Sequence, residues 1–528
     1  IIAASLDISG DIDVDGTTNL DIVDIDGAAN FAADVTFADG ADIITASAGT
    51  SNFRAGVNAG NSIASGGNYN TVVGDEAGTA ITTGDGNVFT GYASGDALTL
   101  GSSNTAIGRD SLGADTIGNH SVAIGRNALT TQNFTSATDA YNTAVGSSAG
   151  AAVTTGTSNT LIGGLAGDAI TTGSQNTATG YLALSADTTG SQNTAYGRSS
   201  LVSNTTGANN TASGYASLAS NTTGNYNTAS GMYSLYVNST ASNNTAMGYE
   251  SLKANTTGAN NVAVGATAGL ALTTGSQNVL IGEKAGDALT TASDNVVMGR
   301  SALGSDTLGS KSVAIGRSAL FTQNFTSATD TYNTAVGYGA GTAVTTGVQN
   351  TLIGGLAGDG ITTGSANVAL GYNSLSAAGG GNGSIAIGKN ALAAQNASGD
   401  RINTAVGLSA GLSVTTGIEN TLIGGLAGDA ITEGEYNIAL GSRALSADTK
   451  GSQNVAIGAY SLTTQNFTSA TASHNVAVGT NTGRYITTGT HNTLIGGLAG
   501  DAITTGGDNV SIGFSSLSAT TTATNNSA

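Results

Sequence analysis

Small, apolar and polar residues recur in a fixed order along most of the chain, and this order repeats about every 17 residues. The pattern Asn-Thr/Val-x-x-Gly starts 27 times between Asn70 and Asn526, and 22 of the 26 intervals between starts are 17 residues long. A degenerate earlier unit begins at Asn52. A short repeat sustained over many copies indicates a stack of similar units, a solenoid. The remaining intervals are 21 residues from Ser121, Ser312 and Asn454, and 19 from Ser384.

Each unit predicts strands and turns. Written from its Asn, it reads N-T-A-x-G-x-x-S/A-L/G-x-x-x-T-T-G-x-x, as in residues 193–209, and we number these positions as places 1 to 17. It has neither the 3.6-residue apolar spacing nor the composition of a helix. Thr/Val/Ile-rich pieces alternate with Gly and Asn, which is typical of strand, turn, strand, turn. We therefore predict an all-β fold, a parallel β-solenoid or β-roll of 17-residue coils.

Two places carry nearly invariant residues. Gly occupies place 5 in all 26 complete coils, for example Gly197 and Gly214, which indicates a positive φ or a close approach of backbone. Asn at place 1 is expected to form a ladder of side-chain amides that are hydrogen bonded from coil to coil.

Places 9 and 12 vary together. Twelve coils have Gly at place 9 and an apolar residue at place 12, such as Gly167 with Ile170. Fourteen have Leu at place 9 and a small or polar residue at place 12, such as Leu201 with Asn204. Protein interiors are packed without large voids or overlaps. We infer that the two side chains compete for one interior volume and that all coils share one continuous core.

The first strand of each coil predicts an oligomer. Places 2 and 4 point to one side and are mostly β-branched or apolar, whereas place 3 points to the other and is nearly always Ala or Leu. A strand that is apolar on both faces should be covered on both. One face can pack inside the coil, and the other, which we expect to be the place-3 face, needs another chain. We therefore expect an intertwined homo-oligomer.

The repeat also resembles known families. The run NNTASGYASLASNTTGNYNTASGMYSL, residues 209–235, resembles the repeat arrays of bacteriophage tail fibres. The units at Ser121–Gly125, Ser312–Gly316 and Ser384–Gly388 are similar to the S/N-x-A-I-G head repeats of trimeric autotransporter adhesins. The resemblance covers residues 52–528. It implies a homotrimer of left-handed parallel β-rolls with one coil per chain in each layer.

The function that this resemblance implies is the structural shaft of a phage tail fibre. Such a shaft is extracellular, belongs to the virion, and presents or contributes to attachment to a host-cell receptor. Its partners are two further copies of the chain, other tail proteins of the virion and the host receptor. The alternative is the head of a bacterial trimeric adhesin on the cell surface.

Residues 1–51 form a separate acidic segment with ten aspartates and no Lys or Arg. Alternation of apolar and acidic residues at residues 6–8 and 12–15 predicts short β-strands with a solvated acidic face. Residues 11–16 match the start of a calcium-binding loop, but Ile22 stands where a bidentate Glu is required. A weak cation site between chains is the alternative to a solvated strand face.

Composition removes several classes of function. The chain has no Cys, which excludes disulfides and thiolate chemistry, and its net charge of −20 opposes nucleic-acid binding. No apolar run approaches the length of a membrane span. No triad of Ser, His and Asp stands out from the repeats, so we expect no enzyme activity, no cofactor and no metal. His474 and His491 lie in adjacent coils without further ligands at metal-binding spacing.

Two features are candidates for recognition. The 21-residue coils carry similar extensions, Thr131–Thr138, Thr322–Thr329 and Thr464–Thr471, which we expect to bulge outward. Their aromatic residues, Phe134, Phe325 and Phe467, either present a receptor-binding bulge or tuck over the end of the coil. The Thr-Thr pairs at places 13 and 14 predict a single outward file of hydroxyls, and ice binding by this file is a minor alternative function.

Overall fold

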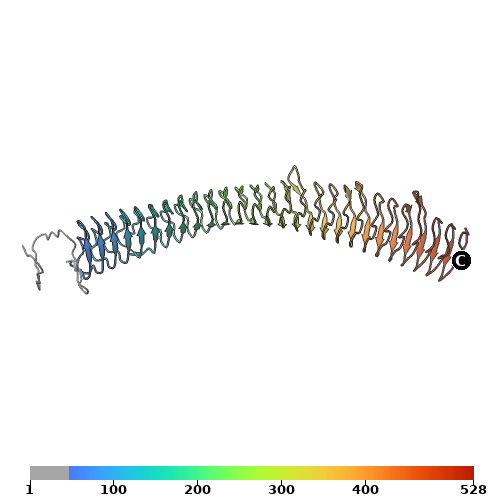
Figure 1. Cartoon of the computed structure of the whole chain (residues 1–528), viewed down its shortest axis with the longest axis horizontal. Helices are drawn as coiled ribbons and strands as arrows, with labels where there is room; N and C mark the ends of the chain where they lie inside the picture. Colours follow the sequence, from blue (N-terminus) through green and yellow to red (C-terminus); the bar gives the residue numbers. More distant parts are fainter. Residues whose placement is uncertain (1–46, 378) are drawn as a thin grey trace, which may run out of the picture. The chain divides into compact units, whose positions relative to one another are not determined.

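The computed structural model describes residues 47–377 and 379–528. The chain divides into two compact units, residues 1–45 and 46–528. The expected strands and the incomplete calcium loop of residues 1–51 lie almost wholly outside the described residues. The second unit is a single stack of coils that runs along the chain in sequence order, as Figure 1 shows. The predicted all-β parallel solenoid is thereby confirmed.

Each coil contributes one three-residue strand to a parallel sheet of 27 strands. The strands of this sheet are β1 (Phe53–Ala55), β2 (Thr71–Val73), β3 (Val88–Thr90), β4 (Thr105–Ile107), β6 (Val122–Ile124), β8 (Thr143–Val145), β9 (Thr160–Ile162), β10 (Thr177–Thr179), β11 (Thr194–Tyr196), β12 (Thr211–Ser213), β13 (Thr228–Ser230), β14 (Thr245–Met247), β15 (Val262–Val264), β16 (Val279–Ile281), β17 (Val296–Met298), β19 (Val313–Ile315), β21 (Thr334–Val336), β22 (Thr351–Ile353), β23 (Val368–Leu370), β25 (Ile385–Ile387), β27 (Thr404–Val406), β28 (Thr421–Ile423), β29 (Ile438–Leu440), β31 (Val455–Ile457), β33 (Val476–Val478), β34 (Thr493–Ile495) and β35 (Val510–Ile512).

The expected second strand is absent from most of the described coils. A second, two-residue strand forms only where a long coil stacks on the coil before it. These strands pair as β5 (Gly118–Asn119) with β7 (Thr138–Asp139), β18 (Gly309–Ser310) with β20 (Thr329–Asp330), β24 (Gly381–Asn382) with β26 (Gly399–Asp400), and β30 (Gly451–Ser452) with β32 (Thr471–Ala472). Elsewhere successive turns complete the coil, and their backbone groups bond to the next coil, as Thr205 N–H does to the Thr222 carbonyl at 2.9 Å.

The strand faces differ from the sequence-based expectation. Equivalent places pair in register, as Thr194 with Thr211, and place 3 points into the coil. Ala195 and Ala212 at place 3 are fully buried within a single chain. The expectation that the place-3 face requires another chain was therefore wrong. The uncovered face is the one formed by places 2 and 4, because one narrow coil encloses only one side of its strand.

Glycine ends each strand because no other residue fits at place 5. Gly197 and Gly214 have φ values of 126° and 134°, a region that L-residues rarely adopt. A Cβ atom on Gly197 would lie 2.7 Å from the carbonyl oxygen of Gly214 in the next coil. Both reasons predicted for this glycine, a positive φ and a close backbone approach, are confirmed.

The asparagine ladder at place 1 is buried inside the stack. The Oδ1 atom of Asn193 accepts the backbone N–H of Asn210 at 3.0 Å and its amide Nδ2 at 3.2 Å. The amide of Asn193 itself donates to the carbonyl of Gly207 in the same coil at 2.8 Å. Each side chain thus joins its own coil to the next, and the predicted ladder is confirmed.

Places 9 and 12 share interior space, as predicted, and place 3 shares it with them. A Cβ atom on Gly167 would lie 2.8 Å from Cδ1 of Ile170 and 2.8 Å from Cδ2 of Leu161, the place-3 residue. In the Leu-type coil of β11, place 3 is the small Ala195 and Leu201 fills the same volume. The core is therefore adjusted at three places, and the pairwise rule described only two of them.

Candidate interaction surface

The outward face of the 27-stranded sheet carries no charge. Its side chains come from the first and third residues of each strand, two from each of 27 strands or 54 in all, and none is Asp, Glu, Lys or Arg. The first residue is Thr, Val or Ile in every strand after β1, and the third is Ile, Val, Leu or Met in 21 strands. We call these 54 side chains the outer strip. An uncharged and largely apolar file of this length is unusual on a protein surface.

The outer strip is uncovered in the single chain. Met247 and Leu370 expose 46% and 42% of their surface, and Tyr196 exposes 62%. Between each such pair of outward residues, the middle residue of the strand is buried in every strand after β1. The strip is therefore a second, uncharged face outside the core. It is largely apolar, except over β10 to β13, where both outward residues of each strand carry hydroxyl groups.

Tyrosines border the strip on both sides. The border positions lie two residues after each strand, at place 6, and two residues before each strand. Eleven of the 16 tyrosines occupy them: Tyr92, Tyr181, Tyr215, Tyr249, Tyr338 and Tyr372 after a strand, and Tyr69, Tyr141, Tyr226, Tyr332 and Tyr436 before one. All three methionines also lie on the strip or at place 6. Tyr and Met, together with Arg, are the residues enriched at protein–protein interfaces.

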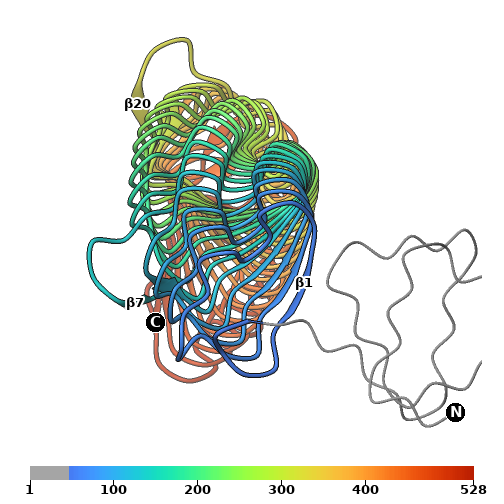
Figure 2. The same ribbon diagram turned by 90° about the vertical axis from the view of Figure 1, so that its left-hand side faces the viewer.

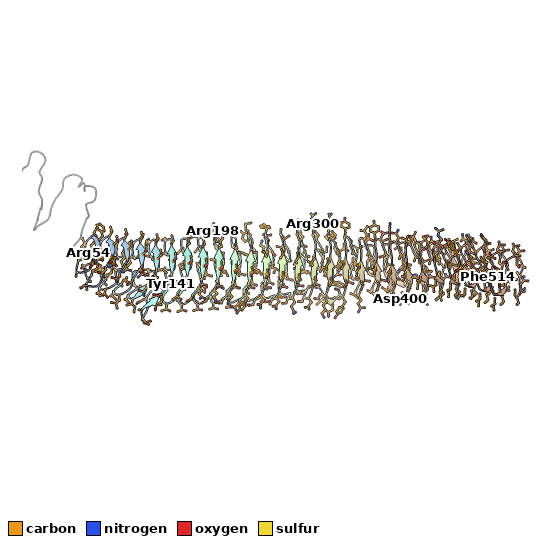
Figure 3. The ribbon with its side chains drawn as sticks, turned by 90° about the horizontal axis from the view of Figure 1, so that it is seen from below. Arg54, Tyr141, Arg198, Arg300, Asp400 and Phe514 are labelled. Atoms are coloured by element: carbon orange, nitrogen blue, oxygen red, sulfur yellow. The ribbon has the colours of Figure 1, made fainter. Side chains whose placement is uncertain are left out.

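Basic side chains lie among the place-6 tyrosines. The guanidinium carbon of Arg198 is 5.9 Å from the ring centres of both Tyr181 and Tyr215, one coil to either side. In the side-chain view of Figure 3, Arg198 and Arg300, which are both place-6 residues, lie along the same edge of the array. Cation–π contacts of this kind hold the exposed rings in defined orientations.

The predicted recognition residues of the long coils do not lie on the surface. Phe134, Phe325 and Phe467 are only 5%, 6% and 7% exposed, so each ring is tucked against the coil. The extensions themselves project, as the loops next to β7 and β20 show in Figure 2. Residues 135–137, which follow Phe134, are exposed. Any contact made by an extension therefore involves its small polar residues, because the aromatic ring is covered.

The other candidate groups remain dispersed. The rings of His474 and His491 stack at 5.3 Å, but the described residues contain no group of three or more His, Cys, Asp or Glu that could hold a metal ion. At places 13 and 14, the hydroxyl of Thr205 donates to the backbone carbonyl of Thr222, and Thr206 is exposed. One exposed file of threonines remains on this side, as the sequence indicated.

The fold places the protein in the class of parallel β-solenoid repeat proteins. No protein-family model and no curated protein matches the chain. Within residues 47–377 and 379–528, no helix has the length and hydropathy needed to span a bilayer. The outer strip was not predicted, although the absence of charge at places 2 and 4 is visible in the repeat. Places 2 and 4 were expected to face the inside of the coil, because the place-3 alanines were expected to face another chain.

Proposed function

We propose that the array is the shaft of a homotrimeric extracellular fibre, a phage tail fibre, in which the outer strips of three chains face one another. The uncharged outer strip is the observation that carries this proposal. A partner that covers it along 27 strands must repeat with the same spacing and over the same length. A second copy of the chain meets both requirements, and cyclic symmetry closes such contacts into a finite ring.

In this role the array is mechanical and non-catalytic. It holds a receptor-binding element at a distance from the virion, and its partners are its own copies, other tail proteins and a host receptor. The phage assignment rests on the resemblance of residues 209–235 to tail-fibre repeats. The trimer rests on that resemblance together with the outer strip.

Native mass spectrometry tests the assembly. We expect a mass of three chains of 51.0 kDa each. Met247→Glu together with Leu370→Glu places charges in the strip and should give monomers, because a buried unpaired carboxylate opposes association. Thr206→Glu, an exposed change on another side of the coil, is the matched control and should leave the mass unchanged. A wild-type chain that stays monomeric at micromolar concentration contradicts the proposal.

A surface adhesin is the second candidate, and the projecting extensions of the long coils favour it. An adhesin would bind along its side, through loops such as residues 135–137, whereas a shaft would not. Replacing residues 135–137, 326–328 and 468–470 with Gly-Ser-Gly should abolish attachment to host cells in an adhesin. The same replacement should leave attachment unchanged in a shaft whose receptor-binding element lies elsewhere.

A further inference from the structure

Over most of the array, the backbone pairing of the sheet and the asparagine ladder do not distinguish one coil from another. Every strand pairs with the next through its backbone, and wherever place 1 is Asn its amide bonds in the same way in successive coils, as between Asn193 and Asn210 or Asn210 and Asn227. The ladder is interrupted only where place 1 is Ser, at Ser121, Ser312 and Ser384. A coil that stacked on its second neighbour, with one coil looped out, would keep these interactions. Something else in the core must select the correct neighbour.

Three buried pairs of polar side chains meet this need. Asp306, at place 12 of its coil, is fully buried and accepts a hydrogen bond from Nε2 of Gln323, at place 12 of the next coil, at 2.6 Å. Asp115 with Gln132 and Asp448 with Gln465 have the same arrangement and the same distance. In each pair the Gln belongs to a 21-residue coil and the Asp to the coil before it.

The extension of the long coil completes the surroundings of the buried carboxylate. The backbone N–H of Phe467 donates to Oδ1 of Asp448 at 3.1 Å, and that of Gly451 donates at 2.9 Å. Gln465 in turn accepts the place-1 amide of Asn475 at 2.9 Å. The pair thus joins three consecutive coils through the Gln side chain, which the 17-residue coils lack at place 12.

Slippage by one coil would break such a pair inside the core. If the coil of Gln323 were looped out, Asp306 would face Val344, the next place-12 residue, which has no donor. If the coil of Asp306 were looped out, Gln323 would lie against Leu289. A buried carboxylate or amide without its partner is costly, whereas a mismatch at the surface is not.

We propose that the three Asp–Gln pairs are register pins, which determine which coil stacks on which and so give every chain the same sequence of coils in its stack. The chain contains its own contrast. Between residues 193 and 260, four successive coils carry Asn at place 12, and each amide donates to the one before, as Asn221 does to Asn204 at 2.8 Å. Coils in that section are interchangeable, and no pin lies among them.

Deletion of whole coils tests the proposal, because it enforces the slipped neighbour. Removing residues 295–311 takes away the coil of Asp306, and removing residues 210–226 takes away one Asn-type coil of the same length. We expect amide hydrogen exchange in coils 278–294 and 312–332 to accelerate at least tenfold in the first variant. Exchange in the coils around the second deletion should stay within twofold of wild type, because Asn238 then bonds to Asn204.

Rescue and a full-length cycle complete the test. Gln323→Ala in the 295–311 deletion removes the stranded amide and should restore slow exchange, since Asn333 and Ser312 keep their bonds to Gly347 and Thr331. In the full chain, Asp306→Ala and Gln323→Ala together should accelerate exchange less than the product of the single changes. The proposal would be overturned if the two deletions accelerated exchange equally, or if Gln323→Ala did not restore slow exchange in the 295–311 deletion. It would also be overturned if the acceleration in the double variant equalled the product of the accelerations in the two single variants.

Discussion

The Cδ1 atom of Ile170 lies 2.8 Å from the position that a Cβ atom on Gly167 would occupy. Leu161 approaches the same point equally closely from the strand of the same coil. In this coil one volume, bounded by places 3, 9 and 12, is therefore shared by three side chains. Where place 3 is Ala and place 9 is Gly, as in the coil of Gly150, leucines of the two adjacent coils, Leu129 and Leu161, reach into the equivalent space. This relationship explains why neighbouring coils keep one backbone path while their core residues differ.

Gly167→Leu should destabilise its coil by about 1–3 kcal/mol through overpacking. Adding Ile170→Asn should recover only part of this, because Leu161 still occupies the space. Adding Leu161→Ala as well gives the coil the core residues found in the Leu-type coil 193–209, Ala195, Leu201 and Asn204, and should recover most of the loss. Local opening free energies from hydrogen exchange measure each step. If the double variant were as stable as the triple, Leu161 would not share the volume.

Leu201→Ala should cost about 2–5 kcal/mol in local stability, because Leu201 is fully buried and Asn204 cannot fill an apolar cavity. Leu100→Ala is the control, since Leu100 is 55% exposed and should change little. The measurement is hydrogen exchange of peptides from the coils concerned. A loss equal to that of Leu100→Ala would contradict a packed interior at place 9.

The repeat predicted most of the fold, and the predictions that were wrong have physical reasons. The alternation at places 2 to 4 predicted a strand, and the constancy of Gly197 and its equivalents predicted the tight approach to the next coil. The prediction of which strand face points into the coil was wrong, because a small residue such as Ala195 is compatible both with a narrow core and with a close contact between chains. The Asp306–Gln323 pair was missed because its two members lie in different coils and only stacking brings them together.

Gly424 and Gly425 offer a matched pair of adjacent substitutions. Gly424 has a φ of 133°, and a Cβ atom on it would lie 2.5 Å from the carbonyl oxygen of Gly441, whereas nothing lies within 4 Å of a Cβ atom on Gly425. Gly424→Ala should therefore cost about 2–6 kcal/mol from backbone strain and overlap. Gly425→Ala should be nearly neutral. Hydrogen exchange around β28 and β29 distinguishes them, and similar effects would refute a strict requirement for glycine at place 5.

The burial of the Asp187 carboxyl group leads us to expect that one section of the array is more stable in mild acid. Burial raises the pKa of Asp187 from 3.8 to about 6, and the hydrogen bond from the Gly190 backbone N–H at 2.8 Å offsets only part of this. The folded state therefore holds the proton more tightly than the unfolded state, so its stability rises as the pH falls from 6 towards 3.8. A pKa difference of about 2 units corresponds to about 3 kcal/mol of stability.

The variant Asp187→Asn, which extends the place-12 ladder from Asn204, should raise the stability of residues 176–209 at pH 7 and remove this dependence on pH. Hydrogen exchange corrected for intrinsic rates, compared between wild type and variant at pH 7 and pH 4.5, measures both effects. If acidification lowered the protection of the wild-type coil relative to that of Asp187→Asn, the stability would depend on pH in the opposite direction. That result would contradict a raised pKa for the buried Asp187 carboxyl group.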